Sequence, residues 1–254
     1  MDVHHHPDLH HKKKNFKEYF LEFLMIFLAV TLGFFAENLR EHFSDKSKEK
    51  EFIVSMKEDL VSDTAQLNSL PALSNTIYEK LDSLYFLLHA AAEGKPYDIH
   101  RLYYLNFTYG FGLVMFVPNN RTISQIKSTG GFSLIKNKAC RDSITVYDNW
   151  NEGVLKTDRE FYQDWMSDLN KMSQKIFYYD GVKTFAFGSN EYDFFLNDSL
   201  QLKLVNNDKL LLTEYANKVR SLMMMFAVLK WAENVQFERG KNLIALLNKE
   251  YDLK

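Results

Sequence analysis

The chain has 254 residues, which is enough for one sizeable hydrophobic core or two small ones. Its 31 basic and 33 acidic side chains nearly cancel, so no positive excess is available to neutralise a phosphate backbone, and nucleic acid is not an expected partner. Four prolines and ten glycines are few for a chain with 15% aromatic residues, which favours long helices over a turn-rich β fold. The single Cys140 cannot form an intramolecular disulfide and indicates no redox compartment.

Residues 1–14 form a polar tail with little apolar surface to bury. The tail holds five of the eight histidines: His4, His5, His6, His10 and His11. A histidine-rich tract can collect metal, but no spaced cysteine or carboxylate ligands accompany it to complete a coordination shell. We therefore interpret this tract as a flexible flank and expect no metal site and no cofactor.

The segment that follows has the length of a membrane span. Tyr19 to Ala36 contains one charged residue, Glu22, and as a helix these 18 residues rise about 27 Å, close to the hydrocarbon thickness of a bilayer. No small-x-small cleavage site follows, and the helical pattern continues through Arg40, so a retained anchor is favoured over a cleaved signal peptide. We predict a single-pass transmembrane helix with its flanks over residues 15–43, with the lipid bilayer as its partner.

The alternative is a buried helix of a soluble domain, because the strictly uncharged run from Phe23 to Ala36 is only 14 residues long. If the helix spans a membrane, one of its stripes is a candidate for self-association. This stripe carries Glu22, Ala29, Gly33 and Glu37, in which Ala29 and Gly33 have the small-residue spacing that lets two membrane helices approach closely. A simple tolerance of small residues explains the same spacing.

Basic residues flank both ends of the expected span, with four lysines before it and four basic residues, mixed with acidic ones, after it. The leading lysines are the more concentrated group, so we expect the N-terminus inside the cell. The large domain after the span would then be periplasmic.

Residues 44–254 predict an all-α, up-and-down helical bundle. A helix from Lys46 to Leu70 is expected to be followed by a second one that begins at Pro71 and stops before Gly94, which gives a helical hairpin. Two further long helical stretches, Asn137 to Ile176 and Asp208 to Leu247, should pack antiparallel. The aromatic-rich crossover between them, Phe177 to Asn207, is expected to be an ordered loop or a short β-hairpin.

Polar residues interrupt the apolar pattern of this domain in two places. The apolar run from Tyr103 to Pro118 contains Asn106, Thr108, Gly110 and Gly112, so a buried segment is favoured over a second span. In the stretch that ends at Ile176, Asn151 and Asp158 share the register of apolar residues and could form a buried polar pair.

The most distinctive internal segment, Pro118 to Asn137, predicts a short helix that is capped at Asn119 or Asn120 and ended by two glycines. Its basic side chains and helix-terminal N–H groups make it a candidate anion-binding corner, with six residues as the candidate ligands: Arg121, Gln125, Lys127, Ser128, Gly130 and Gly131. The alternative interpretation makes Arg121 a structural tie to a neighbouring acid and the glycines ordinary turn residues.

No catalytic, phosphate-loop, dinucleotide or di-metal motif is present in the sequence, and we expect no catalytic residue. The primary hypothesis is a non-enzymatic domain for protein–protein interaction or scaffolding at the cell envelope, bound to itself or to an envelope protein. The alternative is an envelope small-molecule or anion sensor, or an enzyme, with a pocket near Arg121. Cross-linking would separate these two classes.

Three segments resemble an uncharacterised family of single-pass, membrane-anchored proteins of Bacteroidota-type bacteria, a domain of unknown function. They are EYFLEFLMIFLAVTLGFFAENLRE at 18–41, KEDLVSDT at 57–64 and NRTISQIKSTGGFSLIKN at 120–137, and the resemblance thins out after about Trp150. It implies an inner-membrane anchor with a helical domain, and it brings no activity, ligand or catalytic residue.

Overall fold

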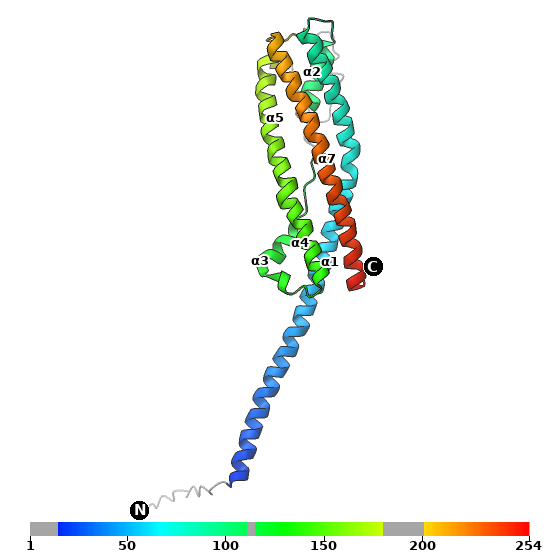
Figure 1. Cartoon of the computed structure of the whole chain (residues 1–254). Coiled ribbons are helices and arrows are strands. Elements are labelled where there is room, and N and C mark those ends of the chain that lie inside the picture. Colours follow the sequence, from blue (N-terminus) through cyan, green and yellow to red (C-terminus); the bar gives the residue numbers. More distant parts are fainter. Residues whose placement is uncertain (1–14, 111–114, 180–200, 254) are drawn as a thin grey trace, which may run out of the picture. The chain divides into compact units, whose positions relative to one another are not determined.

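The computed structural model describes residues 15–110, 115–179 and 201–253, and within these ranges the chain is all-α, as predicted (Figure 1). The predicted tail and most of the predicted crossover lie outside the described residues. The only strand-like pairing in the described part is an isolated bridge between Phe177 and Leu204. The elements are α1 (Phe16–Ala92), α2 (Ile99–Tyr109), α3 (Arg121–Thr129), the 3-10 turn η1 (Gly131–Ser133), α4 (Lys138–Trp150), the π-helical turn η2 (Asn151–Leu155), α5 (Lys156–Ile176) and α7 (Lys209–Tyr251).

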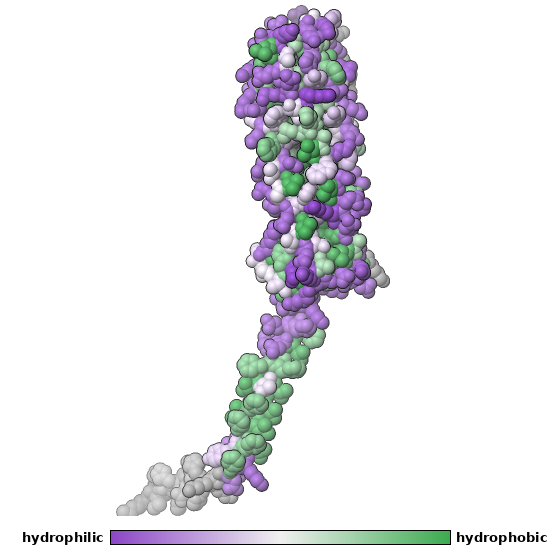
Figure 2. All heavy atoms as spheres, in the orientation of Figure 1, coloured by the Kyte–Doolittle hydropathy of each residue, from purple (hydrophilic) through white to green (hydrophobic). Residues whose placement is uncertain are grey.

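The chain divides into two compact units, the first ending at Glu51 and the second covering Phe52–Lys254. The described part of the first unit is the beginning of α1, where apolar side chains lie exposed on every side of the helix, among them Phe23, Ile26 and Phe34. Figure 2 shows this stretch as a continuous apolar surface. None of its most apolar 18-residue window is buried, and the helix is long and apolar enough to cross a membrane.

The predicted hairpin at Pro71 is wrong, because α1 continues through this proline to Ala92. A proline inside a helix removes one backbone hydrogen bond and typically costs about 3 kcal/mol. The stripe of buried residues keeps its spacing across the proline, from Leu67 and Leu70 to Ser74 and Ile77. Burial of one continuous stripe offsets the local cost, so the helix does not break. It ends where expected, just before Gly94, whose φ of +66° suits glycine.

The two long helical stretches of the second half pack antiparallel, as predicted. Residue numbers rise along α4 and α5 where they fall along α7: Trp150 makes an edge-to-face contact with Trp231, and Tyr162 makes one with Phe226. The indole Nε1 of Trp165 donates to the carbonyl of Lys218. The first stretch is not uniform, because the π-helical turn η2 separates α4 from α5.

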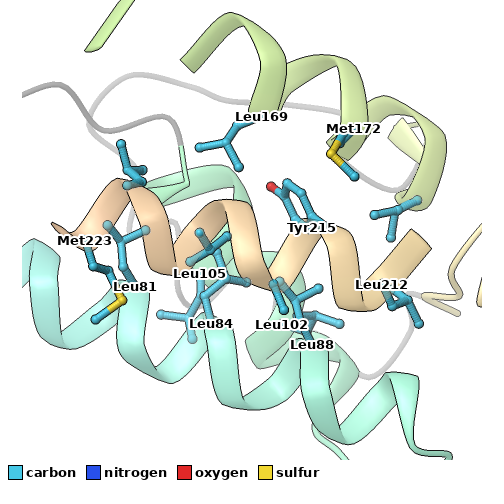
Figure 3. Packing of buried hydrophobic residues seen from close by; sticks show 14 of the residues in the cluster. Leu81, Leu84, Leu88, Leu102, Leu105, Leu169, Met172, Leu212, Tyr215 and Met223 are labelled. Carbon is cyan, nitrogen blue, oxygen red and sulfur yellow. The ribbon is translucent and has the colours of Figure 1, made fainter. Parts of the chain in front are cut away.

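Helices α1, α2, α5 and α7 share the largest hydrophobic core of the second unit (Figure 3). Leu81, Leu84 and Leu88 of α1 face Leu102 and Leu105 of α2, and all five are essentially inaccessible to solvent. The predicted buried segment is buried in part over its described residues, 103–110 and 115–118: Tyr103, Leu105, Asn106 and Phe116 are buried, whereas Val117 is 62% exposed. A buried hydrogen-bond chain also crosses this core: the Tyr215 hydroxyl donates to Asn106 Oδ1, and Asn106 Nδ2 donates to Ser173 Oγ.

Candidate functional site

Residues 115–120, which we call the strap, precede α3 and belong to no helix or strand. Their N–H groups therefore lack helical partners, and buried N–H groups must find acceptors. Side chains of α1 and α7 supply them. Phe116 N–H donates to Glu233 Oε1 (3.0 Å), Val117 N–H to Gln66 Oε1 (3.1 Å) and Asn119 N–H to Asp63 Oδ1 (2.8 Å).

The beginning of α3 is held to α1 by Asp59. This carboxylate is almost fully buried and binds with both oxygens: Oδ2 accepts the Thr122 N–H at 2.9 Å, and Oδ1 accepts Arg121 Nη2 at 2.9 Å. The Arg121 N–H itself donates to the Asn119 side chain. An internal carboxylate thus occupies the helix end where the sequence suggested an external anion.

The other residues of the predicted anion corner also have internal partners. Lys127 Nζ binds the carboxylate of the buried Asp148 on α4 at 2.6 Å. Ser128 Oγ donates to the backbone carbonyl of Gln125, whose side chain lies on the exposed side of α3. Gly130 has φ of +69° and ends α3 with its N–H on the Ile126 carbonyl. Gly131 is buried against Phe52, leaving no room for a side chain.

The two basic side chains are therefore paired with carboxylates of the domain: Arg121 with Asp59 and, at 3.5 Å, with Glu58, and Lys127 with Asp148. A neighbouring acid beside Arg121 is what the alternative interpretation expected, and the anion site stays a prediction.

Replacing Arg121 with alanine is expected to lower the free energy of unfolding by about 1 kcal/mol, because the guanidinium is 62% exposed and its ion pair with Asp59 is partly screened. Urea denaturation of the variant measures the loss. Titration of the wild-type chain with phosphate or sulfate is the second measurement. Saturable anion binding that Arg121→Ala abolishes without any change in stability would contradict the tie.

A second buried carboxyl, Asp63, lies one turn beyond Asp59 on the same side of α1. It accepts the Tyr147 hydroxyl at 2.9 Å as well as the strap amide of Asn119. Burial raises the pKa of Asp63 to about 6, and the negative charge of Asp59 adds to this effect. Burial, together with the charge of Asp63, also raises the pKa of Tyr147. Asp63 and Tyr147 therefore each hold their proton more tightly than they would in water.

The polar contacts continue into η2 and α7. Gln236 Nε2 donates to the Tyr147 carbonyl and to Asn151 Oδ1, so the buried partner of Asn151 is Gln236 and not Asp158. Glu233, one turn earlier on α7, holds the strap at Phe116. Burial raises the pKa of Glu233 to about 7, although the nearby Arg159 guanidinium acts in the opposite direction.

These two carboxyls predict that the domain loses stability as the pH rises from about 5 to about 8. Each has a folded-state pKa above its unfolded value, so the folded state binds the proton more tightly and its stabilisation is lost as the pH passes the folded pKa. The loss is at most about 3 kcal/mol for each carboxyl. Asp63→Asn, which mimics the protonated form, should reduce the slope of unfolding free energy against pH, whereas the exposed Asp142→Asn should not. Equal slopes in all three proteins would contradict the assignment.

The candidate stripe for membrane-helix association lies in the first unit. Ala29 and Gly33 are exposed, and nothing lies within 4 Å of the position that a Gly33 side chain would take. Glu37 pairs with Arg40 of its own helix, and Glu22 is half-buried. Association through this stripe stays a prediction.

One exposed face of the second unit is apolar, and we call it the α5/α7 face. It consists of four side chains, each more than half exposed: Phe161, Met224, Val228 and Trp231. The three from α7 are spaced by four and three residues and share one side of that helix. The same side carries Glu214 and Asn217 earlier in α7, so the apolar patch is confined to about two turns. Val228 and Phe161 also line a hollow of about 130 Å³ between α5 and α7.

The buried acids of α1 and α7 were not predicted, although the spacing of the apolar residues in the sequence indicates them. The apolar stripe of α1 has steps of three or four residues, except for a gap between Leu60 and Leu67, and Asp63 fills that gap. The stripe of α7 has a longer gap between Ala232 and Leu243, which Glu233, Gln236 and Gly240 fill. A polar residue at the missing step of an apolar stripe indicates a buried polar group.

Comparison of the chain with protein-family models, with curated proteins and with solved structures finds no match.

Proposed function

We propose that this chain is a single-pass, membrane-anchored binding module of the bacterial cell envelope, whose helical domain holds a protein partner and catalyses no reaction. The observation that carries the proposal is the pairing of an apolar, unburied span-length helix with a folded domain that exposes a localised apolar face. Monomeric soluble domains rarely leave contiguous apolar side chains in water without an interaction that covers them. The location in the inner membrane with a periplasmic domain rests on the lysines before the span and on the family resemblance.

The structure offers less support for an anion sensor or enzyme near Arg121. Both basic side chains of that corner are engaged by Asp59 and Asp148. The buried carboxyls Asp63 and Glu233 accept hydrogen bonds from the strap, which is a structural task for both of them. We therefore place the functional surface on the α5/α7 face, with a second copy of the chain or an envelope protein as the partner.

Two measurements test the proposal on the full-length chain in native membranes. Extraction with alkaline carbonate should leave the chain in the membrane pellet, and recovery in the supernatant would refute the anchor. A photo-cross-linking amino acid at Val228 should give one discrete protein adduct. The matched control places it at Asn217, on the same exposed side of α7 but outside the apolar patch, where no adduct is expected. Equal labelling from both positions, or none from Val228, would refute the docking face.

A further inference from the structure

The hollow between α5 and α7 has an apolar wall that no other part of the described structure covers. It also contains a carboxylate with an unpartnered oxygen. It is lined by Asp158, Phe161, Tyr162, Met225, Val228 and Leu229. Five of these residues are aromatic or aliphatic, and Asp158 alone carries a charge. One carboxylate oxygen of Asp158, Oδ2, is buried and has no hydrogen-bond partner in the described structure. A buried acceptor without a donor costs about 1 to 3 kcal/mol, so a donor that reached the Asp158 carboxylate from the hollow would be bound favourably.

The cations nearest in sequence to Asp158 do not pair with it. Arg159, the next residue, sends Nη2 to the Phe116 carbonyl of the strap at 2.9 Å, and its buried Nε has no hydrogen-bond partner in the described structure. Lys156, two residues earlier, pairs with Glu152 one turn back on the same helix. Burial raises the pKa of Asp158, which is the expected response of a carboxylate that no internal charge compensates.

The shape of the hollow fits a side chain that combines an apolar stem with a cationic end. A lysine buries its four methylene groups along apolar surface and keeps its ammonium at a polar site. Here the apolar wall of Met225, Val228 and Leu229 would take the stem, and Asp158 would take the ammonium. The hollow is open to solvent, its lining residues Phe161 and Val228 are more than half exposed, and the exposed Met224 and Trp231 lie one turn before and after Val228 on the same side of α7. That surface is wider than a free amine can cover and matches the body of a larger partner.

We infer that the α5/α7 face docks a protein partner through a lysine side chain that enters this hollow and pairs with Asp158. This inference rests on the proposed function and specifies the chemistry of the partner at the docking face. The pair would be partly desolvated, and the apolar rim around it would exclude water, as in the central contacts of protein interfaces.

The chemistry of the hollow can be tested with n-butylammonium as a probe of the lysine side chain. Methyl-detected NMR of the full-length chain in detergent should show saturable shifts at Met225, Val228 and Leu229, with a Kd in about the millimolar range. Asp158→Asn should weaken binding about fivefold, as expected for the loss of a partly exposed ion pair. n-Butanol, of similar length without the charge, should bind no better to the wild type than to Asp158→Asn. An unchanged melting temperature of the variant shows that its fold is intact.

The protein origin of the amine can be tested in native membranes with a water-soluble carbodiimide. This reagent condenses a carboxylate with an amine in direct contact, forming an amide while the carbodiimide takes up the elements of water as a urea. Mass spectrometry should then find Asp158 joined to a lysine of another polypeptide, and the Asp158→Asn chain should give no such product.

Each remaining outcome overturns a defined part of the inference. Absence of saturable butylammonium binding would sink the lysine site, while the docking face itself would still stand if Val228 cross-links to a protein. Butylammonium binding without any lysine adduct would make the occupant a small amine and overturn the protein partner. Failure of both the Val228 adduct and the carbodiimide adduct would remove the proposed function along with the inference.

Discussion

Introducing lysine at both Ile26 and Val30 is expected to release the chain from the membrane. Both positions lie near the middle of the apolar stretch, and both side chains are more than half exposed, so neither substitution disturbs internal packing. A lysine at the centre of a membrane helix costs about 3 kcal/mol, and each large apolar residue contributes only about −0.5 kcal/mol to insertion. Two lysines therefore cancel the contribution of about a dozen apolar residues.

The measurement is the fraction of chain that remains in the pellet after alkaline carbonate extraction and centrifugation. A matched control places the same two lysines at Asn38 and Ser47, exposed positions of α1 beyond the apolar stretch, where full retention is expected. Retention of the Ile26→Lys, Val30→Lys chain in the pellet would show that the helix is held by something other than lipid. The same result would remove the basis of the proposed anchor.

The predicted all-α class followed from composition and periodicity, since both depend on local physics. Long apolar stripes at helical spacing, few glycines and few prolines leave helix packing as the way to bury the apolar side chains. The antiparallel pairing of α5 with α7 followed from the same reasoning, because two long helices that are consecutive in the chain bury most surface side by side.

The predicted hairpin at Pro71 is wrong because the local preference of proline for a helix start does not reflect the tertiary packing around it. Proline opens many helices, and here the residue stands between two apolar runs that each look complete. Only the burial of Leu67, Leu70 and Ile77 on both sides of the proline shows that the stripe passes through. Local preference and global packing disagreed at this residue, and packing determined the fold.

The candidate site could be predicted only in part, because it also depends on contacts between residues that are far apart in the sequence. The sequence identified Arg121 and the glycines of α3 as an unusual cluster but could not show which charges lie opposite them. Asp59 is 62 residues away in the chain and meets Arg121 only because α3 folds back onto α1. Apolar residues on water-facing positions, such as Val228 and Trp231, could not be recognised either, because periodicity does not show which side of a helix the core will occupy.

Replacing Asp59 with alanine is expected to destabilise the domain more than any other single change in the corner around Arg121. The carboxylate is 1% exposed, and its loss leaves the buried Thr122 N–H without an acceptor while also releasing Arg121. An unpaired buried donor costs about 1 to 3 kcal/mol, and the lost ion pair adds about 1 kcal/mol, so a loss of about 3 kcal/mol is expected. For a domain of this size that lowers the melting temperature by several degrees.

A double-mutant cycle with Arg121→Ala separates the two contributions. The double variant should be hardly less stable than Asp59→Ala alone, because removing the carboxylate leaves Arg121 only its exposed 3.5 Å contact with Glu58, which gives a coupling energy of about 1 kcal/mol. Asp59→Asn should recover part of the loss, since its amide oxygen still accepts the Thr122 N–H. If Asp59→Ala were no more destabilising than Arg121→Ala, the backbone contact would contribute nothing, and α3 would be held to α1 by its apolar side chains alone.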